Sequence, residues 1–260
     1  MTVLHVNIKD IYKKEYILLW AILAFKAGLL NASGFLIAGS YVSHVTGFGT
    51  QVGLAMGHDE FTFGIELLVI PFAFIGGALI VSLVLDREYT STQIPRYPLV
   101  QSMITFLLGV IVFLFVSGAF STESPLIHDE NSILLIGLLC LVCGLKNGLT
   151  TWATSGKIRT THITGLATDI GLHLPKLFRP SEASSRYPEP KKVTYVRIIT
   201  IISFSLGSGL AALLIPTIGY RVFYLALGIS GILLWISIIH RRRHQMKILE
   251  TMNLAYADVG

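Results

Sequence analysis

The sequence predicts an all-α polytopic membrane protein with six transmembrane helices and two short re-entrant or interfacial helices, arranged as an inverted repeat of three plus three spans. Three observations predict this fold: apolar runs of membrane-spanning length, a one-sided distribution of basic residues, and an internal repeat. The 260-residue chain is 53% hydrophobic and 13% charged, and its mean hydropathy is +0.68. Soluble domains have roughly a quarter of their residues charged, so this composition excludes a soluble protein.

Six apolar runs each approach the ~20 residues that a helix needs to cross the hydrocarbon layer. The tails and loops between them are too short to form a second hydrophobic core, which excludes a soluble catalytic domain of ordinary size. Two cysteines, Cys140 and Cys143, lie within the fourth run, where we expect small packing residues. The predicted spans are residues 17–38, 61–85, 99–120, 133–152, 196–215 and 222–239.

An eleven-residue motif occurs twice in the chain. Residues 44–54 (HVTGFGTQVGL) match residues 162–172 (HITGLATDIGL) at six of eleven positions, with an offset of 118. Upstream, KAGL beginning at Lys26 matches KNGL beginning at Lys146. We therefore interpret the chain as a tandem duplication. The predicted copies are residues 17–120 and 131–240, between cytoplasmic tails at 1–16 and 241–260.

Each copy contains one short segment rich in Gly and Thr, at residues 45–56 and 163–174. Twelve residues are too few to span the membrane, so we expect re-entrant or interfacial helices. Because each copy crosses the membrane three times, the second copy must be inverted relative to the first. Many secondary transporters share this plan, with binding sites between the copies near the midplane.

Basic residues concentrate on one side of the six-span arrangement. Sixteen Lys and Arg residues fall in the two tails, the loop after the second span, and the segment that joins the fourth and fifth spans, and Arg197 lies just inside the fifth span on the same side. By the positive-inside rule both termini are cytoplasmic. The net charge of +5 therefore reflects topology, and we expect no nucleic-acid partner. The opposite side holds Arg221 and the acidic residues Asp59, Glu60, Glu123, Asp129 and Glu130.

Two lysines lie inside predicted spans, Lys26 near the middle of the first and Lys146 in the fourth. A lysine at the centre of a transmembrane helix costs at least ~2.5–3.5 kcal/mol on insertion scales. A partner must offset this cost: Glu66, Asp169, the carbonyls of a broken helix, or an anionic substrate. Alternatively, Lys146 extends its ammonium group to the cytoplasmic face.

Polar side chains of the spans and short segments complete the predicted site. In each short segment, threonines four residues apart share one helix face, and a histidine shares the neighbouring face with a polar residue seven positions later. Helix capping by the histidines and close packing of small residues are the structural alternatives. The predicted substrate-binding residues are Lys26, Asn31, His44, Thr46, Thr50, Gln51, Lys146, Asn147, Arg159, His162, Thr164, Thr168 and Asp169.

Common enzymatic motifs are absent from the sequence. The chain contains no H-E-x-x-H, no G-x-S-x-G and no phosphate-binding G-x-x-x-x-G-K-[ST] motif. We therefore predict that the protein is not an enzyme and that it needs no catalytic residue, metal or cofactor.

Three motifs resemble a known family. NASGF at 31–35, VSHVTG at 42–47 and IRTTHITGLATD at 158–169 are similar to the YoaK family, over nearly the whole chain. The resemblance implies a bacterial inner-membrane protein with about six helices and no assigned activity. Two positions depart from the family pattern: Asn31 stands where the family usually has Asp, and Phe48 stands where it usually has Asn.

The sequence favours a small secondary carrier in the lipid bilayer that moves a small solute. Lys26, Lys146, Arg159 and the N-termini of the short helices all favour an anionic solute. The alternative is a membrane scaffold or regulatory protein whose basic cytoplasmic linker binds a partner; whether the chain forms a homo-oligomer stays open. A carrier predicts a central cavity that touches both lysines, whereas a scaffold predicts a dry, closed bundle.

Overall fold

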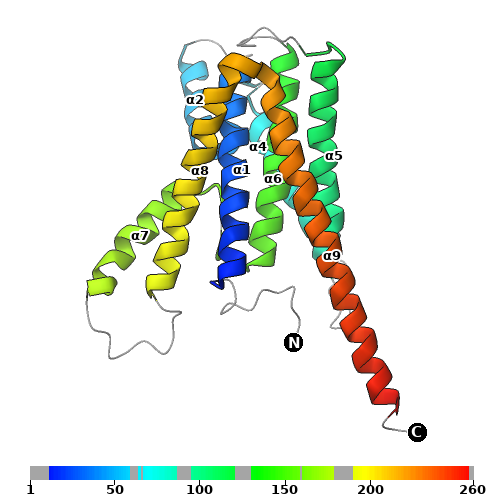
Figure 1. The fold of residues 1–260 in the computed structure, drawn as a ribbon. Helices are drawn as coiled ribbons and strands as arrows, with labels where there is room; N and C mark the ends of the chain where they lie inside the picture. The colour runs from blue at the N-terminus through cyan, green and yellow to red at the C-terminus, as the bar shows by residue number, and fades with distance from the viewer. Residues whose placement is uncertain are drawn as a thin grey trace.

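The structure is a bundle of long helices, seen in a computed structural model (Figure 1). It describes residues 12–58, 64–65, 67–86, 95–120, 130–158, 160–178 and 190–257, and these contain no β-strand. The predicted all-helical class is confirmed. The elements are α1 Lys14–Ala38, α2 Val45–Gly57, α4 Val69–Leu85, α5 Tyr97–Val116, α6 Glu130–Ala153, α7 Ile163–Phe178, α8 Pro190–Ile218, the 3₁₀ turn η2 Gly219–Arg221, and α9 Val222–Ala257.

Four helical stretches in the described ranges are long and apolar enough to cross a membrane: Tyr16–Ala38, Tyr97–Val116, Ser132–Ala153 and Lys191–Arg243. The last stretch includes both α8 and α9, which η2 joins at one end of the bundle (Figure 1). Helix α4 is also apolar but has only 17 residues. These helices identify a membrane protein by their length and composition.

Helix boundaries differ from the prediction at two places. The second predicted span began at residue 61, whereas α4 begins at Val69; residues 61–63 and Glu66 lie outside the described part of the chain. The predicted tail after residue 240 is instead helical, because α9 continues to Ala257. No Gly or Pro occurs between Gly231 and the end of α9, and Arg, Gln, Met, Lys and Leu favour helices. The apolar run ends, but the helix does not.

Helices α1 and α8 pack with their backbones in contact through two glycines. A Cβ atom added to Gly28 would lie 1.9 Å from the carbonyl oxygen of Phe204, and one added to Gly207 would lie 2.0 Å from that of Phe25. No side chain fits between these backbones. Small residues permit such close approach between membrane helices.

Helices α4 and α6 repeat this arrangement. A Cβ added to Gly144 would lie 2.1 Å from the carbonyl oxygen of Phe74, and one added to Gly77 would lie 2.5 Å from that of Leu141. These contacts correspond to those between α1 and α8. Residues of α6 are equivalent to residues 116 positions earlier in α1, and residues of α8 are equivalent to residues 130 positions earlier in α4. The two halves of the chain thus pack across each other through equivalent glycines.

The two short segments are helical and lie at different levels of the bundle. Helix α2 lies beside the end where η2 turns, and α7 diverges from α8 toward the end where α1 begins and α9 finishes (Figure 1). Helix α2 contacts α4, and α7 contacts α8, the corresponding helix of the other half. We call the end where α1 begins the terminal end and the end with η2 the turn end.

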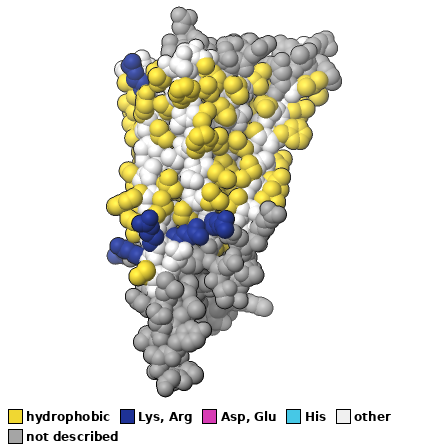
Figure 2. All heavy atoms as spheres, turned by 90° about the vertical axis from the view of Figure 1, so that its right-hand side faces the viewer, with side chains coloured by type: hydrophobic (Ala, Val, Ile, Leu, Met, Phe, Trp, Pro, Cys, Tyr) yellow, Lys and Arg dark blue, Asp and Glu magenta, His cyan; other side chains and the backbone are white. Residues whose placement is uncertain are grey.

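The outer surface is apolar. Figure 2 shows the face over α5 and α9, where hydrophobic side chains cover most of the bundle and Lys and Arg gather toward the terminal end. Large exposed apolar patches mark surfaces that contact lipid or another protein, and this one matches contact with the lipid bilayer. Its exposed residues include Phe106, Phe113, Ile232, Trp235 and Ile236.

Candidate functional site

Both lysines of the predicted site are buried in the bundle. Lys26 is 0% exposed and Lys146 is 1% exposed, so Lys146 does not extend to the surface. A carboxylate partner is not found for either lysine within the described residues. Of the two predicted carboxylate partners, Glu66 lies outside the described residues, and Asp169 pairs with Arg197.

Lys26 belongs to a buried polar cluster centred on Ser230 of α9. Its Nζ donates to Ser230 Oγ at 3.3 Å, and Gln101 Nε2 of α5 donates to the same oxygen at 2.9 Å. Thr105 Oγ1 lies 3.1 Å from it and donates to the Gln101 carbonyl oxygen at 2.9 Å. The cluster ties α1, α5 and α9 together and gives Lys26 one neutral acceptor.

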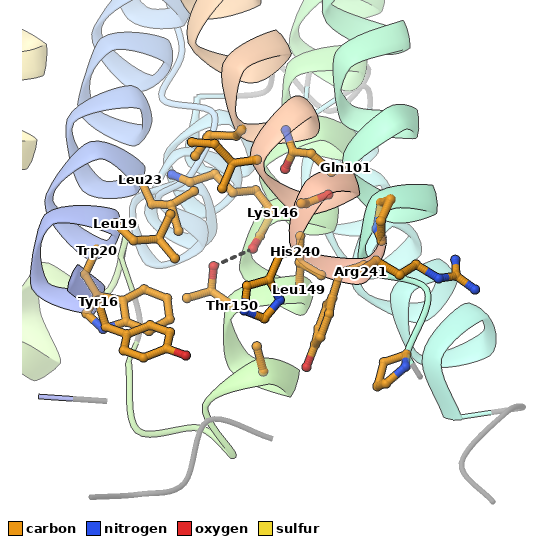
Figure 3. A pocket seen from close by; sticks show the side chains of 17 residues that line it. Tyr16, Leu19, Trp20, Leu23, Gln101, Lys146, Leu149, Thr150, His240 and Arg241 are labelled. Carbon is orange, nitrogen blue, oxygen red and sulfur yellow. Dashed lines mark hydrogen bonds between the residues drawn. The ribbon is translucent and has the colours of Figure 1, made fainter. Parts of the chain in front are cut away.

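Lys146 has no hydrogen-bond acceptor, because its buried Nζ makes no hydrogen bond within the described residues. Its own backbone oxygen accepts a bond from Thr150 Oγ1 at 2.8 Å, drawn as a dashed line in Figure 3. An ammonium group has three donors, and a buried charge without a partner is costly. Lys146 is therefore a buried cation whose donors are unsatisfied within the described residues.

A cavity of about 190 Å³ lies directly against Lys146. Helices α1, α5, α6 and α9 form its walls near the terminal end of the bundle (Figures 1 and 3). In Figure 3 Lys146 extends toward Leu23 at the inner end, while Tyr16 and His240 lie nearer the terminal end. Lys26 does not line it, so the predicted cavity touches one lysine rather than both.

Two further lining groups lack hydrogen-bond partners. Ser237 Oγ and Arg241 Nε are buried atoms without a partner in the described structure, and both residues line the cavity with Lys146. The guanidinium group of Arg241 points away from Lys146 in Figure 3. The cavity thus places the unsatisfied donor groups of Lys146 and Ser237 among apolar walls, and an occupant with acceptor oxygens would satisfy them.

An aromatic cluster closes the same four-helix region toward the turn end. Phe115 of α5 contacts Phe120, Tyr220 and Phe223, with ring centroids 5.1, 4.8 and 5.8 Å apart. Phe115, Phe120 and Phe223 are buried. The cavity walls come from the start of α5 and from the middle of α9, on the terminal side of these rings. The region is therefore hollow near the terminal end and filled by rings near the turn end.

Two buried asparagines bind the residues that precede the short helices. Asn31 Oδ1 accepts hydrogen bonds from Ser43 N at 3.1 Å and from Ser43 Oγ at 2.9 Å. Asn147 Nδ2 donates to Thr161 Oγ1 at 2.5 Å. The asparagines differ by 116 positions, the offset that relates the packing glycines of α1 and α6. They are predicted site residues, but the structure gives them the role of holding α2 and α7.

This correspondence revises the alignment of the lysines. The KAGL and KNGL match placed Lys26 opposite Lys146. With the offset of 116 taken from the packing and the asparagines, Lys146 instead corresponds to Leu30, one helical turn beyond Lys26. The two lysines are therefore both buried, but they do not occupy equivalent positions of the two halves.

The predicted site residues of the short segments lie outside the cavity. Thr50 Oγ1 donates to the Thr46 carbonyl oxygen at 3.5 Å, and Thr168 Oγ1 donates to that of Thr164 at 3.1 Å. These threonines therefore bond to their own helices. Close packing through small residues is also not seen there, because a Cβ at Gly53 or Gly171 would meet nothing within 4 Å. Residues on the exposed surface are His44, Thr46, Thr50, His162, Thr164 and Thr168, with Gln51 half-buried.

Asp169 joins α7 to α8. Its Oδ2 lies 2.9 Å from Arg197 Nη2, and Arg197 Nη1 also contacts His173 Nδ1. The carboxylate is about half exposed, with 46% of its side-chain surface accessible. This pair fixes α7 and takes no part in the cavity. Arg159, another predicted site residue, lies outside the described residues.

Sequence reasoning missed the residues of α5 and α9. Gln101, Thr105 and Ser230 form the cluster around Lys26, and Ser237 lines the cavity. A signal was present, because polar residues within membrane spans face the bundle interior. The predicted site included polar residues of the first and fourth spans and of the short segments, but none of the third and sixth spans.

Comparisons with known proteins place the chain in a family. No curated protein and no solved structure matches it. A protein family described as "Protein of unknown function (DUF1275)" matches residues 19–236. Because that match covers most of the sequence, the chain belongs to the DUF1275 family, which also contains YoaK.

Proposed function

We propose that the protein is a small secondary carrier that moves an anionic solute across the bacterial inner membrane. The observation that carries this proposal is the buried, unpartnered ammonium group of Lys146 at the inner end of a cavity. Charged residues inside membrane helices mark substrate and ion pathways. A binding site near the middle of a helix bundle is also where secondary transporters hold their substrates.

An anion would offset the cost of burying Lys146. The ammonium group costs at least ~2.5–3.5 kcal/mol at the centre of a transmembrane helix. Lys26 shares one hydroxyl oxygen with Gln101 and Thr105. A negative charge beside Lys146 would supply an acceptor and would also be attracted by Lys26. The interior is therefore electrostatically prepared for an anion.

An inverted repeat of three plus three spans is supported by the packing. The contact between α1 and α8 is equivalent to the contact between α6 and α4 of the other half, and the packing glycines occupy corresponding positions in the two contacts. Helices α2 and α7 lie at different levels of the bundle (Figure 1), as inverted copies require. If α4 crosses the membrane and α8 and α9 cross it separately, the six spans of this proposal are α1, α4, α5, α6, α8 and α9.

Such symmetry provides a mechanism of alternating access. One arrangement has the cavity on the terminal side and the aromatic cluster of Phe115 on the turn side. Exchange of the roles of the two halves would open the turn side and close the terminal side. We propose that the terminal side is cytoplasmic, because the exposed Arg96, Arg242 and Arg243 lie there.

Two other functions, a membrane scaffold and an intramembrane enzyme, receive less support. A scaffold predicts a dry, closed bundle, whereas a cavity of about 190 Å³ lies against Lys146. An intramembrane enzyme needs a nucleophile hydrogen-bonded to a base. Ser237 and His240 both line the cavity, but Ser237 Oγ makes no hydrogen bond within the described structure.

Transport currents test the proposal. Proteoliposomes adsorbed on a solid-supported membrane receive jumps of nitrate, acetate or benzoate against gluconate. We expect a transient current with at least one of these anions, and we expect Lys146→Met to abolish it. The matched control is Lys191→Met, which removes an exposed cation at the start of α8 and should leave the current unchanged. Absence of current with all three anions, or an equal current from Lys146→Met, would reject the carrier.

A further inference from the structure

The cavity beside Lys146 combines an ammonium group at its inner end with a largely apolar lining, and Arg241 lines it as well. Its inner end holds the ammonium group, and its walls include Leu19, Leu23, Leu149 and Leu233 together with the ring of Trp20. A simple inorganic anion would satisfy Lys146 and leave these walls without contacts. A neutral apolar molecule would fill the walls and leave Lys146 unpaired. The lining therefore matches a molecule with both properties.

The space beside Lys146 suits a small occupant. An apolar cavity of ~150 Å³ binds benzene, and water needs polar partners to stay in such a space. The present cavity measures about 190 Å³, which accommodates one six-membered ring or a branched alkyl group of similar size, with a small anionic head. A long alkyl chain would extend beyond the described walls.

One negative charge is favoured over two. Lys146 is the cation at the inner end, whereas the guanidinium group of Arg241 points away from it (Figure 3). Lys26 lies behind the wall and donates to Ser230. A second charge on the ligand would meet apolar walls without a partner, which is unfavourable. A carboxylate offers two oxygens as acceptors for the three donors of the ammonium group.

We infer that the cavity binds a small monocarboxylate with an apolar body, its carboxylate on Lys146 and its ring or branched chain against Trp20 and the leucines. The inference rests on the proposed carrier function, since this molecule would be the transported solute. It adds a substrate class to that function.

Isothermal titration calorimetry on the purified full chain in detergent tests the inference, with benzoate as the probe. Benzamide keeps the ring without the charge, and nitrate keeps the charge without the ring. We expect benzoate to bind at one site, and we expect both analogues to bind at least about tenfold more weakly. Palmitate serves to detect a site for lipid chains.

Two variants locate the site. Lys146→Met should weaken benzoate binding about 10- to 100-fold, which is the usual worth of a hydrogen bond to a charged group. Lys191→Met should leave binding unchanged, because that lysine is exposed and remote from the cavity. Leu23→Trp, which fills the inner end, should also abolish binding and provides a second test if Lys146→Met does not fold.

Each other result overturns the inference in a recognisable way. Equal binding of nitrate means an unspecific anion site, and equal binding of benzamide means that Lys146 does not select charge. Palmitate binding more tightly than benzoate means a lipid-chain site, and no benzoate binding removes the substrate class. Benzoate binding without current in proteoliposomes would leave the inference intact and reject the carrier. Currents with nitrate together with no benzoate binding would reject the inference and leave the carrier function intact.

Discussion

The side-chain amide of Asn147 donates a hydrogen bond to the hydroxyl group of Thr161, 2.5 Å away, across the turn between α6 and α7. Asn31 and Ser43 make the corresponding contact between α1 and α2. In each half of the chain, a buried asparagine of a long helix thereby fixes the start of a short helix. The short helices are thus anchored to the long helices of their own half.

Breaking this contact should loosen α7. We expect Asn147→Ala and Thr161→Val each to destabilise the protein by about 1 kcal/mol, the usual net value of one hydrogen bond. Because the two residues share that bond, the double variant should lose less than the sum of the two single losses. Unfolding in SDS with a double-mutant cycle measures this. Strict additivity would show that the bond contributes nothing to stability.

The glycine contact between α1 and α8 gives a second prediction. Gly207→Ala places a methyl group 2.0 Å from the Phe25 carbonyl oxygen, so the helices must separate, at a cost of about 1–3 kcal/mol. Gly209→Ala is the matched control, because its Cβ meets nothing within 4 Å. In a helix, that change should be neutral or stabilising. Equal unfolding free energies for the two variants would contradict the close packing.

Much of the fold could be predicted from the sequence. Apolar length identified the long helices, and the repeated motif marked the starts of both short helices at Val45 and Ile163. The end of α9 could not be predicted from hydropathy, because a helix persists as long as its residues favour it. The segment predicted as a basic tail from residue 241 is therefore helical as far as Ala257.

The candidate site could be predicted only in part. Lys26 and Lys146 were identified because a buried ammonium group is costly wherever it occurs. The threonines and histidines of the short segments were not brought to the cavity. The spacing of residues along a helix shows that they share one helix face, but it does not show which part of the protein that face contacts. In α2 and α7 the faces with the threonines and histidines lie on the exposed surface. Packing also showed that Lys146 and Leu30 are corresponding positions, which a four-residue sequence match could not establish.

Removal of either buried lysine should not destabilise the empty protein. Neither lysine has a carboxylate partner in the described structure. Lys26→Met and Lys146→Met therefore each remove a buried charge and leave no buried carboxylate without its partner. We expect an unchanged or raised melting temperature for both variants, measured without added anions. A drop corresponding to ~3–5 kcal/mol would mean that a carboxylate holds the lysine.

Asp86 at the end of α4 should make stability depend on pH. Hydrogen bonds from Ser82 and from Trp152 lower the pKa of this carboxyl group. A lowered pKa in the folded state contributes stability above the unfolded pKa of ~3.9, and this contribution is lost as the pH falls through the folded pKa. The melting temperature of wild type should therefore exceed that of Asp86→Asn near neutral pH, and the difference should shrink in acid. A difference independent of pH would contradict this assignment.

The central claim is that a cavity reaches from the cytoplasmic side to Lys146. It is tested by labelling a single cysteine with an impermeant thiol reagent, in a background with Cys140→Ala and Cys143→Ala. Ser237→Cys in the cavity wall should react in inside-out vesicles and not in right-side-out vesicles. The exposed Thr217→Cys near the turn end should show the opposite pattern. A Ser237→Cys protein that reacts from neither side would mean a closed bundle and would contradict the carrier.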